Sequence, residues 1–135
     1  MTRLSGKSAL ITGAARGIGR GFAAAFIAEG ATVAIADINL EAAHAAAAEL
    51  GDAAYAVQID VTDQASIDAA VASVVSQAGK LDILVNNAAL FDASETVDIT
   101  RDSFDRLYAV NVAGTLFTMQ AAAAQMIKQG HGGKI

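Results

Sequence analysis

Short apolar runs alternate with longer alanine-rich stretches along the chain. The apolar runs, which predict buried β-strands, cover residues 8–12, 32–37, 54–60 and 82–86. The stretches between and after them have apolar residues at helical spacing and predict helices over residues 18–29, 40–50, about 63–77 and 103–129. Alternation of this kind is typical of a parallel sheet covered by helices. We therefore expect an α/β fold with a doubly wound, Rossmann-type parallel sheet and helices on both faces.

The order of the predicted strands follows from the same pattern. Residues 54–60 alternate between the two faces, which suits a strand nearer the edge of the sheet than the others. For a doubly wound sheet we expect the order 3-2-1-4, with residues 134–135 beginning a fifth strand beside the fourth. No domain boundary, internal repeat or low-complexity tract is found, so residues 1–135 are treated as one domain.

Composition narrows the classes of protein that fit. Hydrophobic residues make up 54% of the 135 residues, and much of this is alanine, which favours helices and close packing. There is no proline and only 17% of the residues are charged, which argues against disorder. No apolar run reaches eighteen residues and no signal-peptide core is found, so we expect no membrane partner and a cytoplasmic location. The net charge of −5 argues against a nucleic-acid partner.

Residues suited to metal or thiol chemistry are scarce. The chain has no cysteine, which excludes disulfides and thiolate metal sites. Its two histidines, His44 and His131, stand apart in the sequence and are expected at the surface. We therefore expect no metal site.

A glycine-rich turn, Thr12-Gly13-Ala14-Ala15-Arg16-Gly17-Ile18-Gly19, follows the first predicted strand and opens the first helix. Gly13 allows a sharp turn, Gly17 lets backbone N–H groups approach an anion, and Gly19 lets the helix pack against the sheet. Free N–H groups and the positive end of the helix dipole then face a pyrophosphate. A plain tight turn is the alternative, but three glycines at this spacing favour a dinucleotide site.

A nucleotide-binding P-loop is excluded by position. Gly6-Lys7-Ser8 resembles the end of that motif, but Met1 stands where its first glycine is required. The segment also precedes the first strand, whereas a P-loop follows one.

Polar residues end the next three predicted strands. They are Asp37, Asp60 and the pair Asn86-Asn87, and in a parallel sheet they lie along one edge, where open α/β folds bind ligands. Each alone is also explained as a helix cap or a turn residue, and for Asp60 the two readings are evenly matched. Together with the glycine-rich turn, they predict a line of contacts along a nucleotide.

Asp37 is the most informative of these residues. It lies eighteen positions after Gly19, close to the spacing of a ribose-binding carboxylate. A carboxylate there accepts hydrogen bonds from both ribose hydroxyls of adenosine and repels a 2′-phosphate. This predicts a preference for NAD over NADP of about tenfold or more, part of which Arg16 in the adjacent turn can offset.

Asn111 lies inside the last predicted helix, where asparagine is a poor helix former and must find hydrogen-bond partners. From the residues alone, an amide satisfied by backbone or water is at least as good an interpretation as a functional group.

These motifs together resemble those of the short-chain dehydrogenase/reductase family. The resemblance rests on the glycine-rich turn, Asp60-Val61, Asn86-Asn87-Ala88 and Asn111-Val112, and extends over essentially the whole chain. Residues 36–40, 87–92 and 114–117 are similar to the bacterial sorbitol (polyol) dehydrogenase branch of the family.

The resemblance implies a role for each matched residue. Gly13, Arg16, Gly17 and Ile18 would line the pyrophosphate, with Gly19 completing the motif. Asp37 and Ile38 would hold the adenosine ribose, Asp60 and Val61 would meet the adenine, and Asn87 with Ala88 would flank the middle of the cofactor. Asn111 matches the catalytic asparagine of the family, which supports a water-linked proton relay to a lysine. Ala89 departs from the pattern, which has glycine there.

The catalytic Ser and Tyr-x-x-x-Lys of the family follow a fifth strand, and this sequence ends as that strand begins. Neither Tyr55 nor Tyr108 has a lysine four residues later. In the family the tyrosine is the acid/base. The expectation is that the chain is the N-terminal part of an oxidoreductase, holds its cofactor-binding half, and is inactive alone.

The leading functional hypothesis is an NAD-dependent oxidoreductase that interconverts a secondary alcohol, such as the hexitol sorbitol, and its ketone by hydride transfer. Its expected partners are a small polyol or ketone substrate and, at full length, copies of itself in a homodimer or homotetramer. The alternatives are a non-catalytic nucleotide-binding or regulatory module, and another activity of the family such as 3-oxoacyl reduction.

Overall fold

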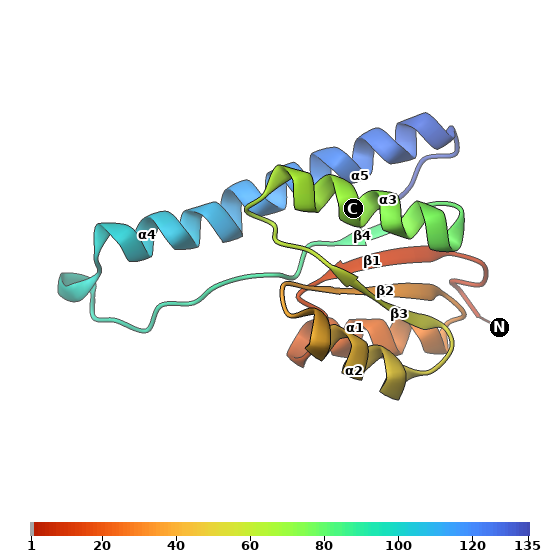
Figure 1. Ribbon diagram of the computed structural model, residues 1–135, viewed down its shortest axis with the longest axis horizontal. Helices are drawn as coiled ribbons and strands as arrows, with labels where there is room; N and C mark the ends of the chain where they lie inside the picture. Colours follow the sequence, from red (N-terminus) through yellow and green to blue (C-terminus); the bar gives the residue numbers. More distant parts are fainter. Residues whose placement is uncertain (1) are drawn as a thin grey trace.

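Four parallel strands form the single sheet of the computed structural model, which describes residues 2–135 (Figure 1). The strands are β1 (Ser8–Thr12), β2 (Thr32–Asp37), β3 (Ala54–Gln58) and β4 (Ile83–Val85). Their order is β3-β2-β1-β4, as expected from the sequence. The β3 strand lies at one edge, also as expected. At the other edge, Lys134 forms a parallel bridge with Ile83, beside β4.

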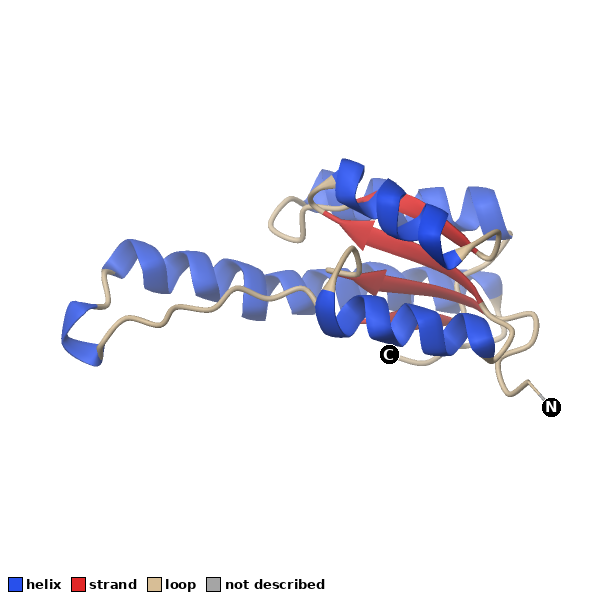
Figure 2. Cartoon of the chain, turned by 90° about the horizontal axis from the view of Figure 1, so that it is seen from below, coloured by secondary structure: helices blue, strands red, loops and turns tan. Residues whose placement is uncertain are grey.

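Helices cover both faces of the sheet (Figures 1 and 2). One face carries α1 (Gly17–Ala28) and α2 (Leu40–Leu50), and the other carries α3 (Gln64–Ala78) and α5 (Thr115–Gln129). Residues that alternate along β1 and β2 point to opposite faces, so two separate cores form. The doubly wound α/β fold predicted from the sequence is confirmed.

Alanine fills much of both cores. On the α1–α2 face the buried helix residues are Ala23, Ala43, Ala46 and Ala47, which pack on Ile11 and its neighbours in the sheet. A methyl side chain lets the helix axes approach the strands closely, and it costs no rotamer entropy on burial. The high alanine content therefore reflects close packing of thin layers, as the sequence predicted.

Two strands are shorter than the sequence predicted. The expected strand over residues 54–60 ends at Gln58, because the Asp60 N–H donates to the Ser66 hydroxyl at 2.8 Å and turns the chain toward α3. The expected strand over residues 82–86 is reduced to Ile83–Val85. The shortening leaves the polar ends of both strands in loops, where they are free to face a ligand.

The predicted helix over residues 103–129 is wrong in two respects. It begins two residues earlier, with α4 (Arg101–Tyr108), and it is interrupted by η2 (Ala109–Gly114), a π-helical turn that precedes α5. A short 3₁₀ turn, η1 (Thr96–Asp98), also lies in the connection before it. π-Helical turns are rare and occur often at functional sites. Apolar spacing alone gives no signal for one.

An arm projects beyond the sheet (Figures 1 and 2). It consists of α4 and the extended connection from residue 86 to residue 100, which run side by side in both views. Two contacts tie the connection to the helical segment that follows it, one between Leu90 and Asn111 of η2 and one between Asp92 and Ser103 of α4. The hydroxyl of Ser103 and the N–H of Ser94 donate to the Asp92 carboxylate, and these bonds lower the pKa of Asp92 to about 2.

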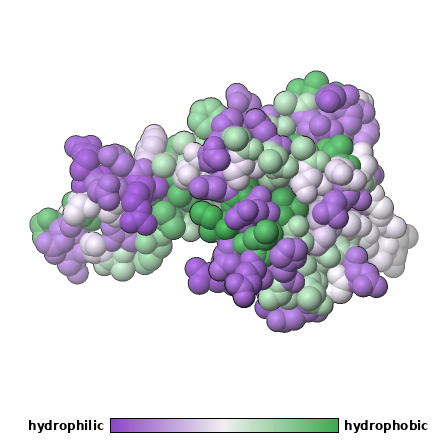
Figure 3. Space-filling view, viewed as in Figure 1, coloured by the Kyte–Doolittle hydropathy of each residue, from purple (hydrophilic) through white to green (hydrophobic). Residues whose placement is uncertain are grey.

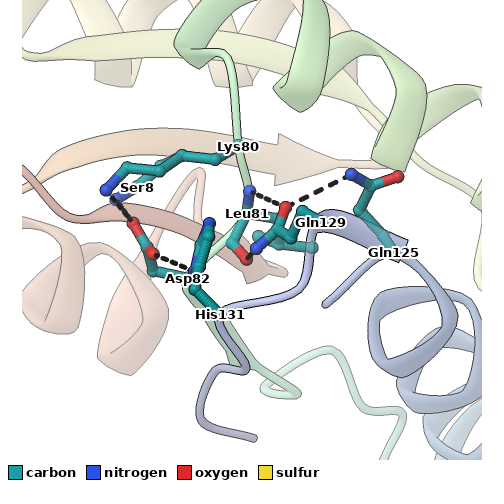
Figure 4. A network of polar contacts seen from close by, with 7 residues as sticks. All are labelled: Ser8, Lys80, Leu81, Asp82, Gln125, Gln129 and His131. Atoms are coloured by element: carbon teal, nitrogen blue, oxygen red, sulfur yellow. Dashed lines mark hydrogen bonds and ion pairs between the residues drawn. The ribbon is translucent and has the colours of Figure 1, made fainter. Parts of the chain in front are cut away.

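A polar network holds the amino end of β4 (Figure 4). Buried Asp82 accepts the Ser8 N–H at 2.9 Å and pairs with Lys80 at 3.0 Å, and His131 lies 3.7 Å from its other oxygen. The side chain of Gln129 binds both the N–H and the C=O of Leu81. The network joins β1, the α3–β4 connection and the segment after α5.

Replacing Asp82 with asparagine is expected to lower the free energy of unfolding at pH 7 by about 1–3 kcal/mol, because a buried charged acceptor is lost. Burial acts to raise the pKa of Asp82, but the Ser8 N–H and Lys80 outweigh it and the pKa is lowered. A lowered carboxyl pKa contributes stability above the unfolded value near 3.9 and loses it as pH falls through the folded value. The difference between the two proteins should therefore shrink in acid. Urea unfolding between pH 7 and pH 3 measures it, and equal stability at pH 7 would contradict the role of Asp82.

Candidate functional site

A cleft of about 410 Å³ lies at the carboxyl ends of the strands. Its walls come from the turns that follow β1, β2, β3 and β4 and from the π-helical turn. The residues that line it are Gly13, Arg16, Gly17, Ile18, Asp37, Ile38, Ile59, Asp60, Val61, Asn87, Ala88, Ala89, Leu90 and Val110. Figure 3 shows apolar surface where the arm meets the sheet-containing body, flanked by hydrophilic groups. The position agrees with the rule that open α/β sheets bind ligands beyond the carboxyl ends of their strands.

The glycine-rich turn follows β1, an inner strand of the sheet, and lines the cleft between the turns after β2 and β4. Gly13 and Gly17 have φ angles of +64° and +60°, a conformation that side-chain-bearing residues rarely adopt. Arg16 occupies the N-cap position of α1 and gives it no side-chain cap, so the first N–H groups of the helix are left for another acceptor. The space beside the Gly17 Cα is open. This geometry suits an anion with several oxygens.

Asp37 lies against this turn. Its Oδ2 accepts the N–H of Ala15 at 3.2 Å, and its Oδ1 accepts the N–H of Asn39 at 3.1 Å. The two bonds fix the carboxylate at the end of β2 and leave further lone pairs free. A charged acceptor is thus held at a set position next to the glycine-rich turn, an arrangement suited to a ligand that carries hydroxyls beside a phosphate.

Thr12 and Asn87 join the ends of β1 and β4 below the cleft. The Thr12 hydroxyl accepts the N–H groups of Asn87 and Ala88, both at 3.0 Å. The Asn87 Nδ2 donates to the carbonyls of Thr12 and Gly13 at 3.0 and 3.1 Å. The backbone N–H and the side-chain NH2 of Asn87 are therefore both hydrogen-bonded within the protein. We predict that Asn87 contacts a cofactor as a rigid part of the cleft floor.

The turn after β3 forms the opposite wall. The Asp60 Oδ1 accepts both the N–H and the hydroxyl of Thr62, so the turn is closed by local hydrogen bonds. Val61 is half-buried, and it packs on the core as well as lining the cleft. Asp60 is thus a turn residue that also lines the cleft, and its contact with a cofactor stays a prediction.

Two predicted site residues do not line the cleft. Gly19 is buried behind the turn, where an added Cβ would lie 2.5 Å from the Asn87 Nδ2 and 2.6 Å from the Gly13 carbonyl oxygen. Asn111 lies in the π-helical turn, and its side chain binds the backbone of Leu90 through both the N–H and the C=O, at 2.8 and 2.9 Å. The Asn111 side chain is therefore an amide whose hydrogen bonds are satisfied by backbone, one of the two interpretations that the sequence left open. Through these bonds it holds Leu90, which lines the cleft.

Sequence reasoning missed four lining residues as members of the site. Ile59 precedes Asp60, Ala89 and Leu90 follow the Asn87-Ala88 pair, and Val110 precedes Asn111. Each of the four is adjacent in sequence to a predicted residue, and this adjacency is the one signal that could have placed them in the site. The exposure of Ile18 and Ile38, at 73% and 65%, adds an apolar surface to the cleft that charge and glycine patterns do not reveal.

No cluster of three or more metal-ligating side chains occurs within residues 2–135. Over the same residues, none of the helices has the length and apolar character needed to cross a membrane. The expected cytoplasmic location stays a prediction. Both histidines are exposed, as the sequence predicted, and neither of them lines the cleft.

The family model described as short chain dehydrogenase matches residues 7–135. The chain belongs to the short chain dehydrogenase family. The family resemblance inferred from the motifs is thereby confirmed.

Among the relatives, a sorbitol dehydrogenase of Cereibacter sphaeroides is 67% identical over 133 residues, covering 98% of this chain and 52% of the relative. A galactitol 2-dehydrogenase of Agrobacterium fabrum is 54% identical with the same coverage. A crystal structure of the 3-ketoacyl-(acyl-carrier-protein) reductase of Brucella melitensis, complexed with NADH, is 41% identical with a TM-score of 0.89, covering 94% of this chain and 52% of that one. The chain spans about half the length of these relatives.

Proposed function

We propose that the protein carrying this short chain dehydrogenase sequence is an NAD-dependent oxidoreductase that interconverts a hexitol and its ketose. The observation that carries the proposal is the bond from the Ala15 N–H to Asp37, because it places the anion-binding turn and a ribose-type carboxylate in one cleft. Similarity to a sorbitol and a galactitol dehydrogenase supports the substrate class.

The residues of the cleft fit the parts of NAD. Gly13, Arg16, Gly17 and Ile18 would hold the pyrophosphate, since the uncapped N-terminus of α1 supplies free N–H groups there. Gly19 would not touch the cofactor, but its lack of a side chain would let α1 pack closely behind the turn. The turn requires glycine at position 13, because a Cβ there would lie 2.9 Å from the Ala88 Cα in the floor of the cleft. This requirement supports the fit to a pyrophosphate.

The remaining residues of the cleft fit the adenosine and the middle of the cofactor. Asp37 would accept hydrogen bonds from the ribose hydroxyls, with Ile38 beside it. Asp60 and Val61 would form the adenine wall, and Asn87 with Ala88 the floor beneath the middle of the cofactor. These six residues all line the same cleft.

NAD bound there would supply the hydride acceptor for oxidation of the secondary alcohol. The chain itself binds and orients: the turn fixes the phosphates, Asp37 fixes the ribose, and Asn111 holds Leu90 at the wall nearest the π-helical turn. The proton-relay role implied by family resemblance for Asn111 remains a prediction. Its backbone carbonyl already accepts the Thr115 hydroxyl at 2.9 Å.

The experiment separates binding from turnover. Titration of residues 1–135 with NADH, followed by nicotinamide fluorescence, is expected to show saturable binding and no oxidation of sorbitol or galactitol, because these residues contain no Tyr-x-x-x-Lys pair. The full-length protein is expected to reduce NAD with one of these hexitols. A cooperatively folded chain that fails to bind NADH would refute the proposal.

A second candidate is reduction of a 3-oxoacyl group, favoured by the likeness to the Brucella melitensis reductase. Full-length protein that oxidises NADH with a 3-oxoacyl thioester and ignores hexitols would establish it. If the full-length protein binds NADH and turns over neither substrate class, the non-catalytic nucleotide-binding module is the better description.

The helical segment from α4 through η2 to the start of α5 offers a surface for self-association, in line with the expected homodimer or homotetramer. Phe104, Tyr108, Val112 and Leu116 recur every four residues and are each 45–55% exposed, so they form one apolar stripe. Phe104 and Tyr108 stack with ring centroids 5.7 Å apart. We propose a second copy of the protein as the occupant. Sedimentation of the full-length protein should show a dimer or tetramer, and Phe104→Asp should shift it toward the monomer.

A further inference from the structure

Gly114 ends the π-helical turn at a position where glycine is otherwise unfavourable. Glycine inside a helix is destabilising relative to alanine, so its presence needs a reason. The reason lies in the turn after β3. A Cβ built on Gly114 would lie 2.7 Å from the Cγ2 of Val61, 3.0 Å from its Cβ and 3.1 Å from its carbonyl oxygen. These contacts are shorter than side chains tolerate without movement of one partner.

The Val61 side of this contact is fixed. The Asp60 N–H donates to the Ser66 hydroxyl at 2.8 Å, and the Asp60 carboxylate accepts two bonds from Thr62. The N–H of Asp63 also donates to the Asp60 carbonyl. The turn that carries Val61 is therefore closed on itself and anchored to the first turns of α3.

The Gly114 side is fixed as well. Thr118 and Ala122, one and two helical turns later, are completely buried against the core. Asn111, one turn earlier, is bound to the Leu90 backbone. The helix cannot withdraw from Val61 without disturbing one of these contacts.

Val61 also lines the cleft. We propose that Gly114 is a positioning residue for nucleotide binding: by letting the helix meet Val61 directly, it sets the distance of the Val61 wall from the rest of the cleft and with it the affinity for the adenosine half of the cofactor. This inference rests on the proposed function, because it takes the Val61 wall as the adenine side.

The test compares Gly114→Ala with Gly21→Ala. Gly21 lies in α1 with open space around it, so its substitution is a matched glycine-to-alanine change inside a helix. Calorimetric titration with ADP-ribose, which carries the adenosine half, and with reduced nicotinamide mononucleotide, which lacks it, separates the two ends of the cleft. Cooperative thermal unfolding of each variant verifies the fold.

Gly114→Ala is expected to weaken ADP-ribose about tenfold, the effect of an overpacked contact, and to leave the mononucleotide within about twofold. Gly21→Ala should change neither affinity and should raise Tm by about 2–5 °C. Val61→Ala removes the closest atom, so the double variant Gly114→Ala/Val61→Ala should bind ADP-ribose about as well as Val61→Ala alone. Rescue of this kind is not expected from a general loss of stability.

The outcomes are distinguishable. Unchanged ADP-ribose binding by folded Gly114→Ala, or equal loss for both ligands, would overturn the inference. If Gly114→Ala does not fold, Val61→Ala decides alone, and it must weaken ADP-ribose without affecting the mononucleotide. If folded wild-type protein binds neither ADP-ribose nor NADH, the proposed function itself fails and the inference fails with it.

Discussion

Gly19→Ala is expected to abolish measurable NADH binding and to lower the free energy of unfolding by about 2–3 kcal/mol. The added Cβ would lie 2.5 Å from the Asn87 Nδ2, 2.6 Å from the Gly13 carbonyl oxygen and 3.0 Å from the Ala14 Cα. Two of these atoms belong to the backbone of the glycine-rich turn and cannot rotate away. Overpacking of this kind costs about 1–3 kcal/mol, and this site lies at the upper end because backbone must shift. Urea unfolding and NADH titration measure the two effects.

The cause of the loss can be separated from helix propensity. Gly19 and Gly21 lie in the same helix, but only Gly19 is surrounded by other atoms. Gly21→Ala should therefore keep NADH binding and gain stability. If both variants bind NADH as the wild type does, close packing of α1 behind the turn is not required for the site.

Asp37→Asn is expected to remove the preference for NAD over NADP. In the wild type we expect NADP to bind at least about tenfold more weakly than NAD. Like charges at about 4 Å cost from about 1 kcal/mol in water to about 4 kcal/mol in a partly buried site, and about 1.4 kcal/mol corresponds to tenfold. Asparagine has nearly the same shape and keeps an acceptor for the Ala15 N–H, although it loses the acceptor for the Asn39 N–H, and it has no charge to repel the 2′-phosphate. The ratio of the two dissociation constants should fall to about threefold or less.

Asp52→Asn is the matched control, because Asp52 is exposed and does not line the cleft. It removes the same charge from the protein and should leave the ratio of the dissociation constants unchanged. Equal affinity of the wild-type protein for NAD and NADP would refute the role of Asp37, or would show that Arg16 offsets the repulsion completely. Arg16→Ala distinguishes these two cases, since the preference for NAD should appear in that variant only if Arg16 is responsible.

The sheet and its order could be read from the sequence because they depend on local patterns. β2 and α2 match the predicted ranges at both ends, since a polar residue or a glycine terminates each of them. The placement of Asp37, Asp60 and Asn87 in one cleft also followed, because parallel strands bring their carboxyl ends to the same edge.

Other features depend on contacts between distant residues and left no local signal. The π-helical turn lies where Asn111 reaches Leu90, twenty-one residues earlier, and where Gly114 meets Val61. The course of the connection over residues 86–100 depends on the bond between Asp92 and Ser103. The sequence predicts that Gly19 serves packing of the helix against the sheet, and the structure shows that Asn87 and Gly13 are the groups that a side chain there would meet.

The bonds from Thr12 to Asn87 and Ala88 have a consequence for how a ligand would be received. They join the ends of the neighbouring strands β1 and β4, and they also fix the floor of the cleft on which a nucleotide would lie. The floor of the cleft is thus already ordered when the polypeptide folds, and it has little conformational freedom left to lose when a nucleotide binds. Capture should accordingly be fast and nearly rigid, and the backbone amides of residues 87 and 88 should resist deuterium exchange equally with and without ligand.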